Sequence, residues 1–483
     1  MSIRSRFAPS PTGYMHIGNL RTALYEYLIA KNAGGSFILR IEDTDQERFV
    51  EGAVDVVYET LKDVGLIHDE GPDKGGDFGP YIQSDRLPLY KEYADKLVEL
   101  NGAHYCFCSA EELEAKKQAA EAQGKAFKFD DPCKHLTLEE AKERIKNGEK
   151  YTVRQTIDPF KKTTFIDEVY GRITVENKTL DEGILLKSDG YPTYNFANVI
   201  DDHLMNITHV IRGNEYLSST PKYNLMYEAF GWNIPTYIHL PPIMKDAHNK
   251  LSKRNGDASF QDLKAKGYLT EAIVNYIALL GWNPKTEQEI FSMDDLIKNF
   301  NIQGINKAPA IFDIEKLKWI NGVYIRNMSL EDFHEKALPY YEKAIKRNLD
   351  LKTLSAVLQP RVNVLSEIID LVDFFDEMPE YDLEMYCHKK MKTDLDVTAK
   401  VLPVALELLQ DKKAFESMQA MHDALMTLPE KMGLKNGQVL WPIRTALTGK
   451  QFTAGGATEA AYLLGQEEVI ARLTKAIEKV NAR

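Results

Sequence analysis

Cysteine is scarce in this chain, which has four cysteines among 483 residues. That number is too small to hold a chain of this length together, so a disulfide scaffold is excluded. The chain has no run of 18 or more apolar residues, and we expect no membrane span. The first ten residues, MSIRSRFAPS, lack the apolar core of a signal peptide. Together these absences predict a cytoplasmic protein.

Positive charge is in deficit as well, because 60 lysines and arginines face 72 aspartates and glutamates, a formal net charge of −12. This balance argues against a protein that coats nucleic acid through its bulk charge. It leaves room for a local basic face, because recognition depends on where the charge lies. The length of 483 residues predicts several domains.

The first 90 residues follow a strand–turn–helix–strand pattern. Residues 3–7 alternate as a half-buried strand does, and Leu20, Leu24 and Leu28 recur at helical spacing until two glycines stop the helix. Residues 36–41, SFILRI, form the next predicted strand. Ligands bind beyond the carboxyl ends of strands in an open parallel sheet. The turn PSPTGYMHIGN and the segment RIEDTD should therefore share one site.

Residues 91–190 predict an insertion into this fold. They carry helix signals with capping boxes that start at Ser109 and Thr137, followed by two strand-like segments, YTVRQTI and GILLKS. A second run of sheet-like segments begins near Tyr194 and includes ITHVIR and TYIHLPPI. We therefore expect the insertion to interrupt the domain that begins in the first 90 residues, and that domain to continue after it.

The rest of the chain is predicted to be helical. From about residue 260 to 325 the pattern has helical spacing, with a capping box of Ser292 and Asp295. From Ser329 to the C-terminus leucine, alanine, glutamate and lysine dominate, and strand-like alternation is scarce. This shift in composition is the main predicted domain boundary.

The turn after the first strand has the chemistry of an anion site. Pro9 and Pro11 stiffen its start, Gly13 can take a positive φ, and Gly18 leaves the backbone open to a flat ring. His16 offers an imidazole N–H to a phosphate oxygen at a helix N-terminus, which favours anions. The plainer interpretation is a capped loop with a buried histidine.

A second loop, KLSKRNGD at residues 250–257, carries two lysines three positions apart. Two mobile ammonium groups suit a triphosphate whose α-phosphate gains charge during reaction. Most such stretches are solvated surface loops, so each segment alone is a weak signal. Together, the His-x-Gly turn and the Lys-Leu-Ser-Lys loop indicate nucleotidyl transfer.

With these segments the chain resembles the class I aminoacyl-tRNA synthetases, and among them the bacterial glutamyl-tRNA synthetase family. The matching segments are RFAPSPTGYMHIGN, LRIEDTD, DDHLMNITHVIRG, LSSTPKY, KLSKR and FDIEKLKWING. The resemblance extends through the first two-thirds of the chain. The helical last third is similar in length and character.

The resemblance implies an α/β fold with a Rossmann-type class I synthetase catalytic domain and an α+β connective, acceptor-binding insertion. A stem-contact domain and an all-α anticodon-binding domain would follow. The expected bounds are 1–90 and 191–245 for the catalytic domain, 91–190 for the insertion, 246–327 for the stem-contact domain and 328–483 for the anticodon-binding domain.

The resemblance also implies the activity. ATP and L-glutamate would form glutamyl-adenylate and diphosphate, and the glutamyl group would pass to the terminal adenosine of tRNA-Glu. No covalent enzyme intermediate is needed, so catalysis would rest on positioning and electrostatics. Mg²⁺ would accompany ATP, bound tRNA would be required for activation, and we expect a monomer.

Motif position implies the roles of individual residues. His16 and Lys253, helped by Lys250, would stabilise charge on the α-phosphate. Asn19 stands where the wider class has a second histidine, and its amide can still donate a hydrogen bond. The implied ATP-binding residues are His16, Gly18, Asn19, Lys250, Ser252 and Lys253.

In the same way Arg6 and Arg212 would bind the side-chain carboxylate of glutamate, and Glu42 its ammonium group. Glutamine is nearly isosteric with glutamate, but leaving a buried guanidinium without its carboxylate costs about 2–5 kcal/mol. Without the flanking motifs, Arg6 and Glu42 could also be residues that form a structural salt bridge at the end of the sheet. The other implied pocket residues are Ser10, Tyr194 and Asn198.

Cys106, Cys108, Cys133 and His135 form a C-x-C half and a C-x-H half around the predicted helix from Ser109. Four such ligands suit a structural, tetrahedral zinc ion, which many members of the family carry in this insertion. The alternative is a set of ordinary thiols, because a spacing of one residue is tighter than in the usual zinc finger.

Selection of one tRNA requires contacts to splayed, single-stranded bases. Arg361, in the segment QPRVN, is the candidate for reading an anticodon base.

Two alternatives stay open: a glutaminyl-tRNA synthetase, and a glutamyl enzyme that also charges tRNA-Gln. The helical last third argues against the first, whose anticodon domains are β-barrels. The chain length argues against a short tRNA-modifying paralogue, and a small-molecule nucleotidyltransferase would not need the long helical C-terminal region.

Overall fold

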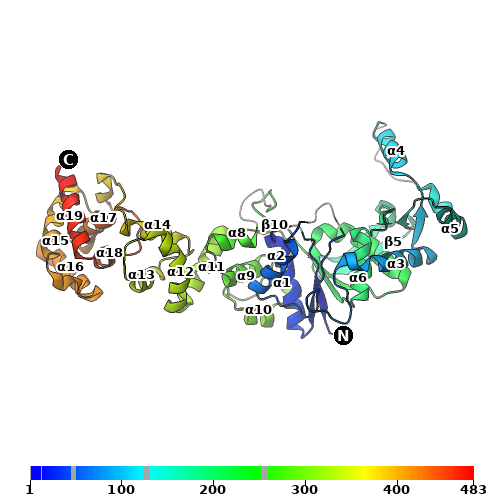
Figure 1. Ribbon diagram of the computed structural model, residues 1–483, viewed down its shortest axis with the longest axis horizontal. Helices are drawn as coiled ribbons and strands as arrows, with labels where there is room; N and C mark the ends of the chain where they lie inside the picture. The colour runs from blue at the N-terminus through cyan, green and yellow to red at the C-terminus, as the bar shows by residue number, and fades with distance from the viewer. Residues whose placement is uncertain (1, 12, 45–49, 123–130, 252–258) are drawn as a thin grey trace. The chain divides into compact units, whose positions relative to one another are not determined.

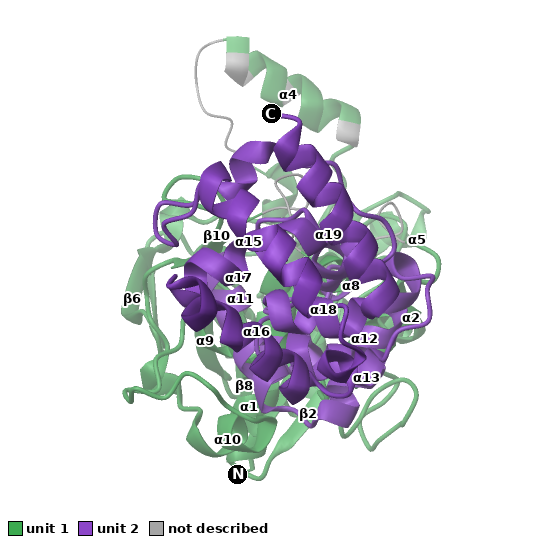
Figure 2. Ribbon diagram, turned by 90° about the vertical axis from the view of Figure 1, so that its left-hand side faces the viewer, with its two compact units in different colours: residues 1–263, 273–313 green, residues 264–272, 314–483 purple. Residues whose placement is uncertain are grey.

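The computed structural model describes residues 2–11, 13–44, 50–122, 131–251 and 259–483. The chain divides into two compact units, which Figure 2 colours separately. Unit 1 consists of Met1–Leu263 and Ile273–Asp313, and unit 2 of Lys264–Ala272 and Ile314–Arg483. No helix in the described part of the chain is long and apolar enough to cross a membrane.

The central sheet of unit 1 combines a two-stranded sheet, β1-β2, with a four-stranded sheet that contains β8 and β9, so its strands are distant in sequence (Figure 1). Strand β1 (Arg4–Phe7) is parallel to β2 (Ser36–Leu39), and β8 (His209–Gly213) is parallel to β9 (Thr236–Leu240). The amide of Thr208, just before β8, donates to the carbonyl of Arg4 at 3.0 Å and ties the two pairs together. The carboxyl ends of β1, β2 and β8 therefore meet at one edge.

Helix α1 (Ile17–Asn32) connects β1 to β2 and is buried along most of its length. It ends where predicted, because Gly34 has a φ of 64° and the amide of Gly35 donates to the carbonyl of Ala30 at 2.8 Å. A Cβ atom at Gly35 would lie 2.0 Å from the carbonyl oxygen of Ile3. Glycine at this position is what allows the helix end to approach the start of β1.

The predicted insertion contains a three-stranded antiparallel sheet with the strand order β3-β4-β7. Its core is continuous with the helices that follow it, because Tyr105 and Val153 belong to the same buried cluster as Phe196 and Tyr227. The elements of this part are α3 (Leu87–Glu99), β3 (Ala103–Cys106), α4 (Ala110–Ala122), η2 (Pro132–His135), α5 (Leu138–Lys146), β4 (Thr152–Gln155) and β7 (Ile184–Leu186).

The hairpin of β5 (Lys162–Asp167) and β6 (Gly171–Glu176) joins the central sheet, although the predicted bounds place it in the insertion. Asp167 of β5 pairs with Tyr237 of β9 in parallel register, and the strand order is β6-β5-β9-β8. Phe165 is buried with Val210 and Tyr237 in one cluster.

The prediction of sheet-like structure from near Tyr194 is wrong at its start. Tyr194–Leu204 form helix α6, and the next strand begins only at His209. Phe196, Val199 and Ile200 are buried at helical spacing. This spacing favours a helix and outweighs the preference of the β-branched residues for a strand. By contrast, the capping boxes at Thr137 and Ser292 are confirmed, and Ser109 exchanges the corresponding hydrogen bonds with Glu112.

The remaining elements of unit 1 include a short parallel pair, β10 and β11. They are α2 (Ala53–Asp63), η1 (Gln83–Arg86), η3 (Asn177–Thr179), η4 (Asn214–Ser218), α7 (Thr220–Phe230), β10 (Ile243–Met244), α10 (Met293–Asn299), η5 (Ile302–Gly304) and β11 (Ala310–Ile311). The chain passes between the units within α8 (Phe260–Ala265) and α9 (Thr270–Leu279).

Unit 2 contains helices and no strand among its described residues, as the composition predicted. Its apolar side chains, Leu402 and Leu473 among them, form the buried interior. The elements are α11 (Ile314–Asn327), α12 (Leu330–Ala344), α13 (Leu351–Leu358), α14 (Glu367–Val372), η6 (Asp373–Phe375), η7 (Leu383–Tyr386), α15 (Leu395–Leu408), η8 (Lys412–Phe415), α16 (Met418–Met432), α17 (Asn436–Thr448), α18 (Ala457–Leu464) and α19 (Gln466–Asn481).

Candidate active site

A polar cavity of about 290 Å³ lies at the shared carboxyl edge of β1, β2 and β8. Five of the six predicted glutamate-binding residues line it, together with Asn19 of the predicted ATP set. Its lining residues are Arg6, Phe7, Ala8, Pro9, Ser10, Asn19, Thr22, Glu26, Glu42, Tyr194, Ile211, Arg212, Gly213, Glu215 and Tyr216.

Asn198 is the predicted pocket residue that the structure does not place in the lining. It lies one turn after Tyr194 on α6, and its side-chain amide donates to the carbonyl of Tyr194 at 2.6 Å. The ring of Tyr194 lies 5.3 Å from the ring of Tyr216, centroid to centroid. Asn198 is therefore positioned to support the helix turn that carries Tyr194.

A buried ion network underlies one wall of the cavity. Oδ1 of Asp202 accepts from Nε of Arg6 at 3.0 Å and from Nη1 of Arg40 at 2.7 Å, and Arg40 also donates to Oε1 of Glu42 at 3.0 Å. Burial would raise the pKa of Asp202, but Arg6 and Arg40 lower it below the ordinary value. The positive charge of Arg6 is thus partly neutralised before any substrate binds.

Arg212 has different partners. Its Nε donates to Nε2 of His239 at 3.1 Å, and its Nη2 donates to Oγ1 of Thr220 at 2.9 Å. The rings of Tyr216, Tyr223 and Tyr237 surround the guanidinium carbon at 5.2, 4.7 and 5.4 Å from their centroids. The ion pairs between described residues do not include Arg212, so its charge is available to a bound carboxylate.

Asp167 and His239 hold Arg212 in this orientation. Nδ1 of His239 lies 2.7 Å from Oδ2 of Asp167, and both side chains are fully buried. The carboxylate directs the imidazole hydrogen to Nδ1 and leaves Nε2 as the acceptor for Arg212. Burial lowers the pKa of His239, which favours this neutral form.

The sequence analysis did not identify Asp167 or His239. The only signal was the strand pattern TYIHL, in which Tyr237 and His239 are two residues apart and so face the same side. The pairing of Asp167 with the strand that carries His239 is not visible in the sequence.

The turn after β1 has the predicted features. His16 caps α1, and its Nδ1 accepts from the amide of Gly18 at 2.9 Å, which directs the imidazole hydrogen to Nε2. A Cβ atom at Gly18 would lie 3.1 Å from Nδ1 of His16. Gly13 has a φ of 104°, as expected.

The segment directly after the predicted lysine loop is fixed near this turn. The amide of Phe260 donates to the carbonyl of Met15 at 3.2 Å, and Ser259 forms an isolated β-bridge with His16. At the other end Lys250 is exposed and forms an isolated bridge with Met244. The predicted residues Ser252 and Lys253 lie outside the described residues.

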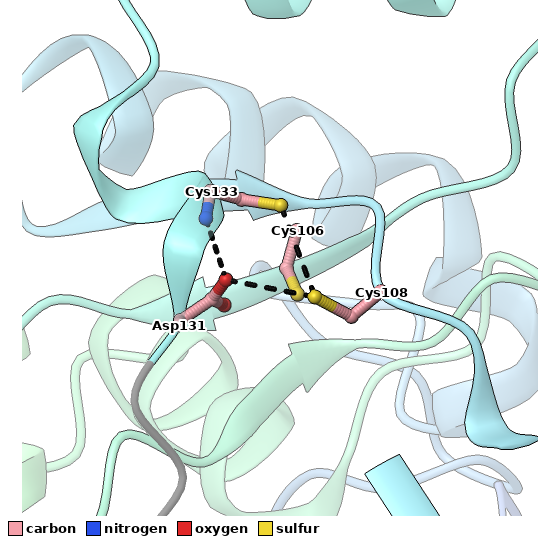
Figure 3. A group of neighbouring side chains, drawn as sticks. All are labelled: Cys106, Cys108, Asp131 and Cys133. Carbon is pink, nitrogen blue, oxygen red and sulfur yellow. Dashed lines mark hydrogen bonds between the residues drawn. The ribbon is translucent and has the colours of Figure 1, made fainter. Parts of the chain in front are cut away.

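Three of the four predicted metal ligands come together. The sulfur atoms of Cys106, Cys108 and Cys133 and a carboxylate oxygen of Asp131 all lie within 4.8 Å of one another, and Figure 3 shows them pointing toward one centre. The sulfur atoms of Cys108 and Cys133 are 4.0 Å apart. Tetrahedral zinc with Zn–S bonds of about 2.3 Å separates two sulfur ligands by roughly 3.8 Å.

His135 is not brought into this group, contrary to the sequence prediction. It is exposed at the end of η2, whereas Asp131 caps the start of η2 by accepting from the amide of Cys133 at 2.9 Å. That hydrogen bond holds the Asp131 carboxylate beside the sulfur atoms. Burial raises the pKa of the Cys106 and Cys108 thiols. Metal binding here would therefore displace protons.

Arg361 lies in unit 2, in the turn that follows α13, with 44% of its side chain exposed. Its guanidinium donates to the carbonyl of Val357 and, at 3.3 Å, to Oε1 of Glu459. The role predicted for it in reading an anticodon base stays a prediction.

Comparison with known proteins agrees with this geometry. Residues 2–319 match the family model "tRNA synthetases class I (E and Q), catalytic domain", and residues 332–477 match "Anticodon binding domain". The glutamate–tRNA ligases of Clostridium tetani and Clostridium acetobutylicum are each 58% identical to this chain over 479 residues. Each match covers 99% of this chain, and 98% and 99% of those proteins respectively.

A solved structure is similar over the whole chain. The glutamate tRNA ligase of Elizabethkingia meningosepticum, in complex with its amino acid, has a TM-score of 0.89 at 34% identity, covering 99% of this chain and 100% of that one. The Elizabethkingia anophelis glutamate-tRNA synthetase has a TM-score of 0.86 with the same identity and coverage. The chain thus belongs to the class I aminoacyl-tRNA synthetases, and among them to the glutamate–tRNA ligase family.

Proposed function

We propose that the cavity binds L-glutamate and that the chain joins it to tRNA-Glu in two steps. The observation that carries this proposal is Arg212, a buried guanidinium in the cavity wall whose hydrogen bonds go to His239 and Thr220 rather than to a carboxylate. A buried cation oriented in this way has a strong requirement for an anionic partner. The side-chain carboxylate of glutamate meets that requirement.

The two predicted arginines differ in their contribution. Arg6 already donates to Asp202 at 3.0 Å, so we assign the main contact with the side-chain carboxylate to Arg212. Both hydrogen bonds from Arg40 to Glu42 end on Oε1. The other oxygen of Glu42 can therefore accept from the ammonium group of the substrate. Ser10 and Tyr194 complete the lining.

Rejection of glutamine follows from the same contact. A glutamine side chain would occupy the space of glutamate but leave Arg212 buried without a carboxylate, at a cost of about 2–5 kcal/mol. That cost corresponds to a discrimination of roughly 30-fold to several thousand-fold. The relatives reported above bear glutamate names, so the glutaminyl alternative is not favoured.

In the first step the α-carboxylate of glutamate attacks the α-phosphorus of ATP, and the bond to diphosphate breaks. We assign His16 to this phosphate, because Nδ1 accepts from Gly18 and the ring hydrogen is directed to Nε2. Lys250 and Lys253 would stabilise the charge that develops there, with Mg²⁺ bound alongside ATP. In the second step the glutamyl group passes to the terminal adenosine of the tRNA.

The cysteine group suits a structural zinc ion. Cys106, Cys108 and Cys133 would hold it with Asp131, and it would crosslink β3 to η2 without taking part in the reaction. The donor set supports this assignment, because three thiolates and one oxygen close a tetrahedral site. We assign tRNA recognition beyond the acceptor end to unit 2, with Arg361 as the candidate for an anticodon base.

The test is ATP–diphosphate exchange with glutamate or glutamine, with and without tRNA-Glu. We expect exchange with glutamate that depends on tRNA, and loss of this exchange by orders of magnitude in Lys253→Ala with an unchanged melting temperature. Exchange supported by glutamine alone would contradict the assignment of the pocket. Full activity of Lys253→Ala would contradict the role of the lysine loop.

A further inference from the structure

Glu26 lines the same cavity, and the mechanism above gives it no role. It lies in the middle of α1, between residues that pack against the sheet, and its side chain is 1% exposed. Its carboxyl group contacts the buried guanidinium of Arg6, which lines the same cavity, so the protonation state of Glu26 can affect binding there.

The hydrogen bonds of Glu26 are incomplete. Its Oε1 accepts from Nη1 of Arg6 at 3.3 Å, and its Oε2 is buried and makes no hydrogen bond with a described residue. Arg6 also donates to Asp202 at 3.0 Å, so Glu26 receives only a share of that guanidinium. An ionised carboxylate accepts hydrogen bonds on both oxygens and donates none. The surroundings of Oε2 therefore do not suit an ionised group.

The charged groups around Glu26 come from three other segments: Arg6 on β1, Arg40 directly after β2 and Asp202 on α6. Burial raises the pKa of Glu26 well above its ordinary value, Asp202 adds to this effect, and the two arginines oppose it. Farther along the cavity wall lie Arg212, Glu42 and Glu215, the titratable tyrosines Tyr194 and Tyr216, and Arg6 itself.

The cavity must accept a substrate that carries a negative side chain. An ionised Glu26 would add a like charge to the wall and would compete with the substrate for Arg6. A protonated Glu26 adds no charge and offers an O–H donor, and a hydrogen bond from a neutral donor to a carboxylate is among the stronger ones.

We propose that Glu26 is a further specificity-determining residue, which carries its proton on Oε2 and donates it in a hydrogen bond to the side-chain carboxylate of bound glutamate. This inference rests on the proposed function, because it takes the cavity to be the glutamate site. Glu26 thus adds a donor to the contact made by Arg212, and the two together recognise a carboxylate.

Two variants separate this role from a structural one. Glu26→Ala removes the donor and should raise the KM for glutamate about 10- to 100-fold, the effect of losing one hydrogen bond to a charged group, with the KM for ATP unchanged. Glu26→Gln keeps a neutral donor of the same length and should stay within about threefold of the wild type. Glu92→Ala removes an exposed carboxylate of α3 and serves as the matched control, with no expected change.

The pH profile provides a readout that does not depend on how the alanine variant folds. In the wild type the KM for glutamate should rise as the pH rises through the elevated pKa of Glu26, because the donor is then lost. In Glu26→Gln only the part of the rise that comes from deprotonation of the substrate's own ammonium group should remain. A wild-type profile that coincides with that of Glu26→Gln up to pH 10 would overturn the proposal.

Other outcomes overturn the proposal for different reasons. Equal or tighter glutamate binding by Glu26→Ala would show an ionised carboxylate that competes for Arg6. A KM for Glu26→Gln as high as that of Glu26→Ala would show that the donor is not what matters. If the wild type gives no glutamate-dependent ATP–diphosphate exchange, the proposed function itself is wrong. If the wild type gives normal exchange and Glu26→Ala has an unchanged KM for glutamate, only the role of Glu26 is rejected.

Discussion

Arg212 has hydrogen-bond partners that fix its orientation without neutralising its charge. His239 and Thr220 accept from two of its nitrogen atoms, and the tyrosine rings surround the rest of the group. The contrast with Arg6, which already donates to Asp202, explains how two arginines in one cavity can have different roles. At the scale of single residues, the specificity that we propose for glutamate rests on which guanidinium group lacks a carboxylate.

The first prediction concerns Arg212→Gln. Removing the cation should raise the KM for glutamate by at least about 30-fold, because a buried charge pair with the substrate is lost. Arg172→Gln, on the exposed face of β6, is the control and should behave as the wild type. Glutamate-dependent ATP–diphosphate exchange measures both, and an Arg212→Gln enzyme with normal glutamate KM would contradict the assignment.

The second prediction concerns His239 as a positioning residue. His239→Leu removes the acceptor for Nε of Arg212 and should raise the KM for glutamate about tenfold, the effect of one lost hydrogen bond. His239→Gln can still accept and should recover most of this loss, with the KM for ATP unchanged in both variants. If kcat and the KM for glutamate worsened to the same degree in both variants, His239 would have only a structural role.

The same histidine predicts a pH effect on stability. Burial lowers the pKa of His239 in the folded state below its unfolded value of about 6.5. The unfolded chain therefore binds a proton more readily. The stability contributed by neutral His239 is present above about pH 6.5 and is lost as the pH falls. Thermal melting of the wild type should decline more steeply below pH 6.5 than that of His239→Gln; equal slopes would contradict this.

Sequence motifs identified the cavity residues that lie directly after strands and at the first helix, including Ser10, Glu42 and Arg212. They did not identify Glu26, Asp167 or His239. Each of these is a buried polar residue whose importance depends on what packs against it. That information comes from contacts between segments about 20 to 200 residues apart and is not visible in a local pattern.

At the scale of elements, the turn after β1 is connected to the segment that directly follows the lysine loop. The connection consists of the β-bridge between His16 and Ser259 and the hydrogen bond from Phe260 to Met15. The chemistry of the turn and of the lysine loop linked these two segments in the sequence, and these contacts give a physical connection between the turn and the end of the loop.

The third prediction tests this turn. Gly18→Ala would place a Cβ atom 3.1 Å from Nδ1 of His16, so the imidazole must shift. We expect kcat/KM for ATP to fall about 10- to 100-fold, because a small misplacement of a catalytic group is costly. Gly183→Ala is a matched control, since its Cβ would meet only Asp181 at 3.4 Å. Normal ATP kinetics in Gly18→Ala would contradict the role of His16.

The fourth prediction concerns the metal group of the insertion. Purified protein should contain one zinc ion, and Cys108→Ser should lose it and become sensitive to proteolysis between β3 and α5, while the KM for glutamate changes little. Asp131→Asn should weaken zinc binding, whereas His135→Ala should retain it, because only Asp131 lies beside the sulfur atoms. Elemental analysis measures the zinc content of both variants. Retention of zinc in Asp131→Asn and its loss in His135→Ala would support the ligand set predicted from the sequence.

Local signals predicted elements well where the structure depends on nearby residues. The capping boxes at Thr137 and Ser292 form as expected because each involves residues three positions apart. The strand predicted near Tyr194 is a helix, and the β5–β6 hairpin joins the central sheet through Asp167 and Tyr237, which are 70 positions apart in the sequence. Pairing at that distance depends on the whole sheet rather than on local preference.

At the scale of the whole molecule, the composition of the chain predicted a sheet-containing part followed by a helical part. The structure has these as unit 1 and unit 2, and unit 2 consists of Lys264–Ala272 and Ile314–Arg483. The predicted domain bounds, including the one at residue 328, stay predictions.

The central claim is that this chain attaches glutamate to tRNA, and direct aminoacylation tests it most simply. Purified protein is incubated with ATP, Mg²⁺, a tRNA-Glu transcript and either labelled glutamate or labelled glutamine, and acid-precipitable label is counted together with the AMP released. We predict stoichiometric charging with glutamate, one AMP for each glutamyl-tRNA formed, and charging with glutamine at least about 30-fold less efficient. Charging with glutamine at comparable efficiency, or AMP formation without glutamyl-tRNA, would contradict the account.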